Sequence, residues 1–218
     1  NFVTISGGFG MEKSSQQVTL ADDSLVETDL LTLGGSGLDV FVGLNGPATE
    51  PDAMGLLLSG VTFGLALFAP ATGQSGYNGV SWTSLKANAS GVTFLGLPSE
   101  LTISATDIFV VVNQVSSGAA DQVIDFSSSP LEVAAGPATI ISLDMDGADG
   151  NLLRAGGAIL IGLFDSELSA DYLAFEKKQQ DGVDVLSVAG LDVNFTLKVG
   201  STQIISLTIA SAAFIFME

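Results

Sequence analysis

The stretch Leu101–Asn113, LTISATDIFVVVN, decides the fold, because variants of it recur from one end of the chain to the other. It consists of an alternating apolar run, a short pair of mostly small residues and a second alternating run. Similar stretches begin at Leu31, Leu56, Leu85, Leu186 and Leu207. Apolar residues that recur with a period of two line one face of a β-strand. The chain is therefore predicted to consist of long strands, each with one apolar face.

The phase of the alternation changes within each stretch. Leu58 ends one apolar set and Val61 begins the next, a step of three residues instead of two. The same step occurs from Gly35 to Leu38, Ala89 to Val92, Ala105 to Ile108 and Val188 to Leu191. One extra residue would turn all later apolar side chains to the opposite face unless a β-bulge bends the strand there. We expect bulges that keep the apolar face on the inside of a curved sheet; the alternative is a turn between two shorter strands.

Composition excludes several classes of function. The chain has 218 residues, of which 47% are hydrophobic, enough for one large all-β domain. Its net charge is −18, from 24 acidic and 6 basic residues, which excludes nucleic acid as a partner because phosphate binding needs clustered Lys and Arg. No run of about 18 apolar residues could form a membrane-spanning helix. The chain is also predicted to contain no disulfide, because it has no cysteine.

We predict that the chain is not an enzyme. It has neither histidine nor cysteine, which removes Ser-His-Asp, Cys-His and zinc chemistry. Paired carboxylates such as Asp144 and Asp146 could in principle serve a glycosidase. Nothing in the sequence places these two in a cleft.

One segment gathers oxygen ligands beside two glycines, in ISLDMDGADGN. Its candidate calcium ligands are Asp144, Asp146, Asp149 and Asn151. Calcium prefers such hard oxygen ligands. The spacing departs from the EF-hand loop, because Ala148 and Ala155 stand where that loop has ligands. Calcium is therefore the one cofactor considered, and a polar turn without metal is the competing interpretation.

A second candidate site lies in the segment 71–79, ATGQSGYNG, whose composition predicts a loop. Tyr77 lies within this loop and Trp82 follows it closely. Sugar rings stack on aromatic faces, so these two residues are candidates for glycan binding. In the alternative interpretation the two aromatic side chains cover the end of a core.

The end of the chain resembles its beginning. Met11-Glu12-Lys13 matches Phe175-Glu176-Lys177 at an offset of 164, and Gly37-Leu38-Asp39-Val40 matches Gly190-Leu191-Asp192-Val193 at an offset of 153. We therefore predict a first β repeat over residues 1–163 and the degenerate start of a second over residues 164–218. Repeats that cannot bury their own faces gain stability by stacking, so we expect one continuous unit.

Several longer stretches resemble a known class of proteins. They are EKSSQQVTLADDSLVETDLLTLGGSGLDVFVGLNG, LLLSGVTFGLALF, VSWTSLKANASGVTFLGL, LTISATDIFVVVN and ISLDMDGADGNLLRAGG. They are similar to the tandem repeats of giant secreted or surface-anchored bacterial adhesin-like proteins, which carry LEPR-XLL signatures or RTX-type ends. The resemblance implies an extracellular or cell-surface location and transfers no site residue. The chain opens in strand pattern without a signal peptide, so we expect a processed product or an excerpt.

The predicted fold is all-β, an elongated stacked-strand sheet, groove or β-solenoid of bent strands. The last stretch, LTIASAAFIFME, has one charge and no proline, which predicts a strand edge open to pairing. Our leading hypothesis is a structural or adhesive protein of the bacterial exterior that joins copies of itself end to end in a filament, matrix or adhesin stalk. The alternatives are an apolar β-groove that carries lipid, as in bridge-like lipid transfer and AsmA-type proteins, and a glycan-binding module.

Overall fold

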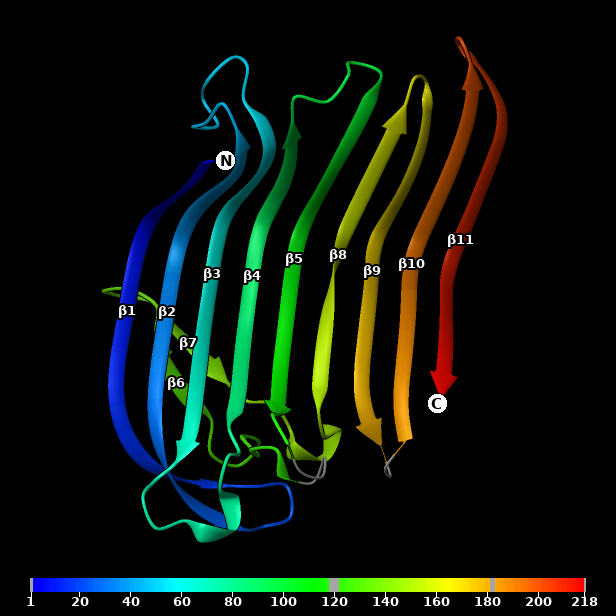
Figure 1. Cartoon of the computed structure of the whole chain (residues 1–218). Helices are drawn as coiled ribbons and strands as arrows, with labels where there is room; N and C mark the ends of the chain where they lie inside the picture. Colours follow the sequence, from blue (N-terminus) through cyan, green and yellow to red (C-terminus); the bar gives the residue numbers. More distant parts are fainter. Residues whose placement is uncertain (1, 118–121, 181–182, 218) are drawn as a thin grey trace.

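The computed structural model of the chain describes residues 2–117, 122–180 and 183–217. Nine long strands form one antiparallel sheet (Figure 1). They are β1 (Phe2–Thr19), β2 (Leu25–Leu44), β3 (Met54–Pro70), β4 (Trp82–Leu95), β5 (Leu101–Val115), β8 (Leu152–Leu163), β9 (Ser166–Gln180), β10 (Val183–Val199) and β11 (Thr202–Met217). The all-β prediction is confirmed.

Each strand of this sheet pairs with the strands before and after it in sequence, apart from the excursion between β5 and β8. Of the architectures expected from sequence, the structure is an open sheet whose strands are joined by hairpins. The strands β9 to β11, which contain the predicted start of a second repeat, extend the same sheet. Whether they form a repeat remains a prediction.

The strands run through the predicted phase steps without ending, which rules out turns between shorter strands. Gly37, Gly60 and Asp107 have φ angles of 59°, 60° and 52°, the left-handed conformation typical of a bulge. The registers of β2 with β3 and of β5 with β8 shift at these levels. The steps lie opposite one another in neighbouring strands, and in β1 and β8, which keep their alternation, the register with the adjacent strands shifts at the same level. The strands therefore bend along one line, the crease (Figure 1).

The predicted step is wrong in one strand, β10. Its apolar face continues from Val188 to Gly190 and resumes at Val193, and Leu191 lies on the opposite face. The step therefore falls at Leu191-Asp192, where Asp192 has a φ of 46°, and not at Ala189-Gly190. Gly190 carries no side chain, so the sequence pattern could not show which face it occupies. The other four predicted steps are confirmed.

The excursion between β5 and β8 folds over the convex face of β1 to β4 and is here called the cap. It contains the hairpin β6 (Leu131–Ala134) and β7 (Ile140–Leu143) and the short helix η3 (Gly147–Asp149); a second short helix, η1 (Ser75–Tyr77), precedes β4. The cap and sheet share a core of buried side chains: Val18, Leu20, Val26, Leu30, Ala66, Phe68, Trp82, Val115, Val123, Ile124, Phe126, Val133, Leu143, Met145 and Leu152.

A row of three glycines lets the cap lie directly on the sheet. Gly10 pairs with Gly34 and Gly34 pairs with Gly64, across three neighbouring strands. A Cβ atom on Gly10 or Gly34 would overlap the carbonyl oxygen of Ala134, and one on Gly64 would lie 2.9 Å from the Cβ of Ile141. Any side chain in this row would therefore lift the hairpin off the sheet.

Gly34→Ala is expected to lower the free energy of unfolding by about 1–3 kcal/mol, because the added methyl group overpacks the contact with Ala134. Gly162→Ala is the matched control, since its Cβ would meet nothing closer than 3.6 Å. The control should leave stability unchanged or raise it slightly. Chemical denaturation of the three proteins measures the difference, and equal stability of the two variants would contradict the role of the glycine row.

Candidate binding groove

The concave face of the sheet is apolar along all nine strands. Residues paired across antiparallel strands share a face, so the register assigns each side chain to one side. The concave face, here called the groove, carries Val3, Ile5, Phe9, Met11, Leu31, Leu33, Leu38, Val40, Val42, Leu56, Leu58, Val61, Phe63, Leu65, Leu67, Leu85, Ala87, Ala89, Val92, Phe94, Ile103, Ala105, Ile108, Val110, Val112, Leu153, Ala155, Ile159, Ile161, Leu168, Ala170, Leu173, Phe175, Leu186, Val188, Val193, Phe195, Ile205, Leu207, Ile209, Phe214 and Phe216. The predicted apolar inner face is thus present.

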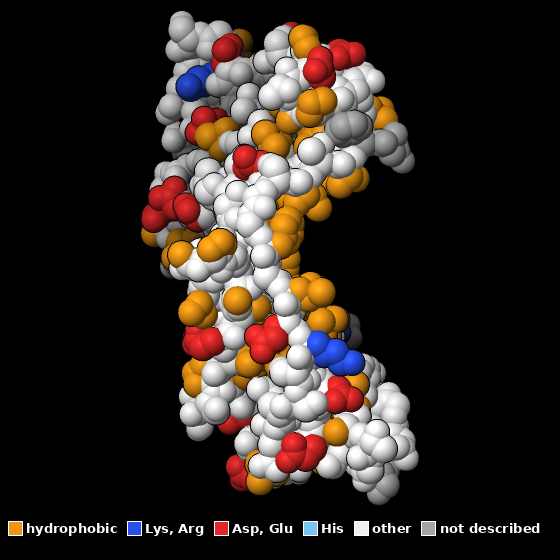
Figure 2. Space-filling view, turned by 90° about the vertical axis from the view of Figure 1, so that its left-hand side faces the viewer, with side chains coloured by type: hydrophobic (Ala, Val, Ile, Leu, Met, Phe, Trp, Pro, Cys, Tyr) orange, Lys and Arg blue, Asp and Glu red, His pale blue; other side chains and the backbone are white. Residues whose placement is uncertain are grey.

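The groove has a buried floor and exposed walls. Leu38, Ala89 and Ala170 lie at the crease and are only 2–6% exposed, whereas Phe94 and Phe175, away from it, are 40% and 49% exposed. Figure 2 shows the hollow in profile, with hydrophobic side chains along its inner surface. No element within the described residues covers this face.

Glycines at the crease make room for the floor. A Cβ on Gly35 would lie 2.8 Å from the Cδ1 atom of Leu38 and equally close to the ring of Phe63, and one on Gly157 would lie 2.6 Å from the Cδ1 atom of Ile108. The larger side chains therefore lie flat over their neighbours' backbones. This close packing explains how a floor residue is buried although the face is open.

Polar side chains border the groove where the strands reach the end of the sheet near the cap. Ser15 donates to Asp29 at 3.0 Å, and Gln17 donates to Glu27 at 2.9 Å. On β9 and β10, Lys177 forms an ion pair with Asp184 at 3.1 Å. These polar pairs mark where the apolar surface of the groove ends along the strands.

The accessible surface of the chain is larger than its size predicts. It measures 11,945 Å², whereas a compact monomer of the same mass exposes about 9,400 Å². Large contiguous apolar surfaces of this kind mark sites that bind proteins, membranes or apolar ligands. The groove is the surface that meets this description.

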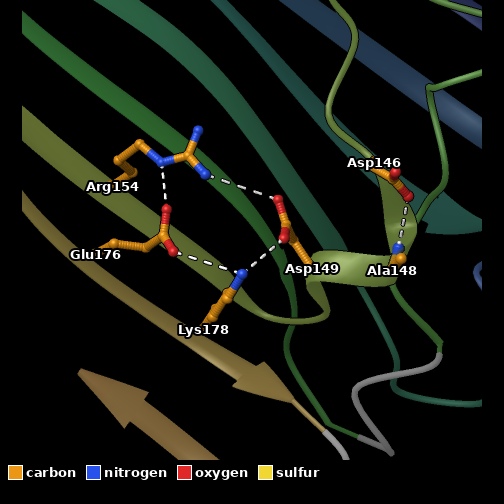
Figure 3. Close-up of polar contacts among 6 residues, drawn as sticks. All are labelled: Asp146, Ala148, Asp149, Arg154, Glu176 and Lys178. Atoms are coloured by element: carbon orange, nitrogen blue, oxygen red, sulfur yellow. Dashed lines mark hydrogen bonds and ion pairs between the residues drawn. The ribbon is translucent and has the colours of Figure 1, made fainter. Parts of the chain in front are cut away.

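The four candidate calcium ligands do not point to one centre. Asp146 accepts a hydrogen bond from the Ala148 amide at 2.8 Å (Figure 3), Asp144 forms an ion pair with Lys86, and the Asn151 side chain accepts from the Val115 amide at 2.9 Å. Among the described residues, no three acidic side chains gather as metal ligands would. Calcium binding remains an untested prediction.

Asp149 belongs instead to a network of four charges that ties η3 to β8 and β9 (Figure 3). Lys178 lies 3.1 Å from Asp149 and 3.6 Å from Glu176, and Arg154 donates to Glu176 at 2.5 Å. The hydrogen bond to Asp149 raises the pKa of Lys178 despite partial burial. The sequence did not reveal this network, because β9 lies outside the segment that contains the acidic cluster.

The glycan interpretation is wrong for Trp82, because its ring is buried. Trp82 is 1% exposed, and its indole nitrogen donates to the Gln122 carbonyl at 2.6 Å. Tyr77 packs against it with ring centroids 5.9 Å apart. The two aromatic side chains cover the end of the core, which was the competing interpretation.

Asp125 links two segments of the cap, the one around Ser127 and the start of η3 at Gly147, through hydrogen bonds. It accepts hydrogen bonds from the Gly147 amide at 3.0 Å and from the amide and hydroxyl groups of Ser127. Burial raises the pKa of the Asp125 carboxyl, but these hydrogen bonds outweigh burial, so its pKa lies below the ordinary value. The stability that it contributes is present above its unfolded pKa and is lost as the pH falls through the lowered pKa.

Asp125→Ala is expected to destabilise the chain by about 1–2 kcal/mol near pH 7, because two amides lose their acceptor. The difference from the unsubstituted chain should shrink below about pH 4 as Asp125 becomes protonated. Thermal unfolding across a pH series measures it. Glu132→Ala removes one equally negative, exposed side chain from β6 and should change stability little; a pH-independent effect of Asp125→Ala would refute the assignment.

Comparison of the chain with protein-family models, with curated proteins and with solved structures finds no match. Within the described residues, no helix combines the length and the apolar composition needed to cross a membrane.

Proposed function

We propose that the chain binds the acyl chains of lipids in the groove. The observation that carries this proposal is an uncovered apolar trough that crosses nine strands (Figure 2). At a spacing of about 4.8 Å between neighbouring strands, the trough is about 38 Å long. Each methylene group that a lipid buries in it contributes about 0.8 kcal/mol.

The shape of the groove favours a slender occupant. If the concave faces of two copies met, they would touch only at their borders. A flat protein surface would also touch only the borders of the groove. In both cases the floor around Leu38 and Ala89 would stay uncovered. Flexible hydrocarbon chains follow a curved wall and fill the trough. Curvature therefore supports a lipid over a second copy as the occupant of this face.

The charges of the chain favour a lipid without net negative charge. Four of the six basic residues are held in ion pairs with acidic side chains: Lys86, Arg154, Lys177 and Lys178. With a net charge of −18, the chain repels anionic headgroups and anionic membrane surfaces. A zwitterionic or uncharged headgroup, left in water at the border of the groove, meets no such barrier.

Phe94→Asp combined with Phe175→Asp should weaken lipid binding about tenfold or more, because a carboxylate in each wall penalises contact with hydrocarbon. The probe is fluorescent phosphatidylcholine in phosphatidylcholine vesicles, with extraction by the protein as the readout. Native mass spectrometry of the purified chain should also show bound lipid.

The matched control is Ile140→Asp with Leu191→Asp, which places the same two charges on exposed positions outside the groove. This control should extract lipid as the unsubstituted chain does. Absence of co-purified lipid together with failure to extract the probe would refute the proposal.

A structural repeat of the bacterial exterior, the hypothesis that the sequence favoured, is the second candidate. The strand directions support it. Six strands of the main sheet precede β9, so β9 runs in the same direction as β1 and a following repeat would continue the sheet without reversal. Each repeat would then bring its own cap and lengthen the groove.

If assembly is the function, electron microscopy of the purified chain at rising concentration should show filaments. Calcium should promote them if the cation screens the acidic surface or binds between copies. The comparison is between samples with calcium and samples with a chelator. Compact, monodisperse particles under all conditions would count against this candidate and leave lipid binding unaffected.

A further inference from the structure

The lining of the groove ends differently at the two ends of the strands. Near the cap it is bordered by the polar pairs described above. At the opposite end lie the links β2–β3, β4–β5 and β8–β9 (top of Figure 1), and the last concave side chains there include Met54, Leu101 and Leu163. Met54 and Leu163 are 49% and 51% exposed. These three residues and Phe164 are here called the open rim, to which the apolar lining extends.

Phe164 has a backbone conformation that a bulky side chain disfavours. It is the first residue of the two-residue turn between β8 and β9 and has a φ of 51°, where hairpin turns usually have Gly, Asn or Asp. Its amide donates to the Glu100 carbonyl at 2.7 Å, which ties the turn to the β4–β5 link. Because Phe164 is 76% exposed, burial within the chain does not offset the strain. A strained, exposed aromatic residue points to a role outside the fold, in contact with a partner.

The charges beside the open rim select the kind of partner. Glu50, Asp52, Glu100 and Asp165 are exposed in the links at this end of the sheet. They repel an anionic membrane. They attract the choline or ethanolamine cations that form the outermost layer of a zwitterionic bilayer. Phe and Leu side chains insert where the headgroups of such a bilayer meet its acyl chains, so the rim matches this surface in both charge and apolarity.

We propose that the open rim docks on a zwitterionic lipid bilayer, with Leu163 and Phe164 inserted below the headgroups. This inference rests on the proposed function, because it supplies the route by which a lipid reaches the groove. An acyl chain that leaves the bilayer passes over Leu163, Ile161 and Ile159, which share the concave face of β8. The rim therefore governs the transfer of lipid into the groove and not the affinity of the groove for lipid.

Phe164→Gly separates docking from folding. Gly adopts a positive φ without strain, so the thermal unfolding midpoint should stay the same or rise. Binding to phosphatidylcholine vesicles, measured by flotation, should weaken about tenfold, because the aromatic ring is no longer buried in the bilayer. Phe164→Trp should retain binding, since Trp favours the membrane interface. A Phe164→Gly variant that binds these vesicles as the unsubstituted chain does would overturn the proposal.

Two controls locate the contact at the open rim. Ile140→Asn removes a 63% exposed apolar side chain from the cap and should leave vesicle binding unchanged; a tenfold loss there would overturn the proposal. A nitrobenzoxadiazole label on Asp165→Cys should shift its emission to the blue on vesicles. The same label on Thr72→Cys, in the β3–β4 link at the cap end, should not, and the reverse result would place the contact elsewhere. Phosphatidylglycerol vesicles should bind more weakly, and tighter binding would refute the choice of a zwitterionic partner.

Lipid transfer distinguishes a failure of docking from a failure of the proposed function. Phe164→Gly should bind monomeric fluorescent lysophosphatidylcholine with unchanged affinity and should extract phosphatidylcholine from vesicles about tenfold more slowly. Extraction at the unsubstituted rate would overturn docking and leave lipid binding in the groove intact. If neither the variant nor the unsubstituted chain binds the monomeric lipid, the proposed function fails and the route into the groove fails with it.

Discussion

The fold depends on one constraint, that hydrogen-bonded neighbouring strands must bend at the same level. A bulge in a single strand would break the ladder on both sides unless the adjacent strands also changed phase or twisted there. The steps and register shifts therefore fall on one line across the sheet, from the shift at Gly7 and the step at Gly37 to the step at Asp192. That line turns a flat sheet into a trough and keeps apolar side chains on its inner side.

The two faces of the bent sheet therefore have different surroundings. The convex face of β1 to β4 is packed by the cap, which lies close because Gly10, Gly34 and Gly64 carry no side chains. Asn113 strengthens this packing, since it accepts from Ser84 at 2.9 Å and donates to the Ile124 carbonyl at 2.8 Å. The concave face receives no such cover from the residues that the structure describes. Stability thus comes from the cap and the ladder, which leaves the groove available for binding.

The acidic character of the chain is consistent with a covered convex face and an open concave face. Most basic side chains are engaged in ion pairs, and the network around Asp149 anchors the cap to β8 and β9. Acidic side chains that remain in water keep a protein with a large apolar face dispersed. The same charges discourage partners with negative surfaces, so shape and apolarity remain as the means of recognition.

The sequence by itself determined the all-β fold, four of the five bends and the apolar inner face, because alternation and its phase are local properties of a strand. It misplaced the step in β10, where Gly190 leaves no mark in the pattern. Only the tertiary structure decided the antiparallel order, the position of the cap, the burial of Trp82 and the partners of Asp149. Backbone hydrogen bonds between strands are the same for every sequence, so which strands meet, and which face is covered, depends on contacts between residues far apart in the chain.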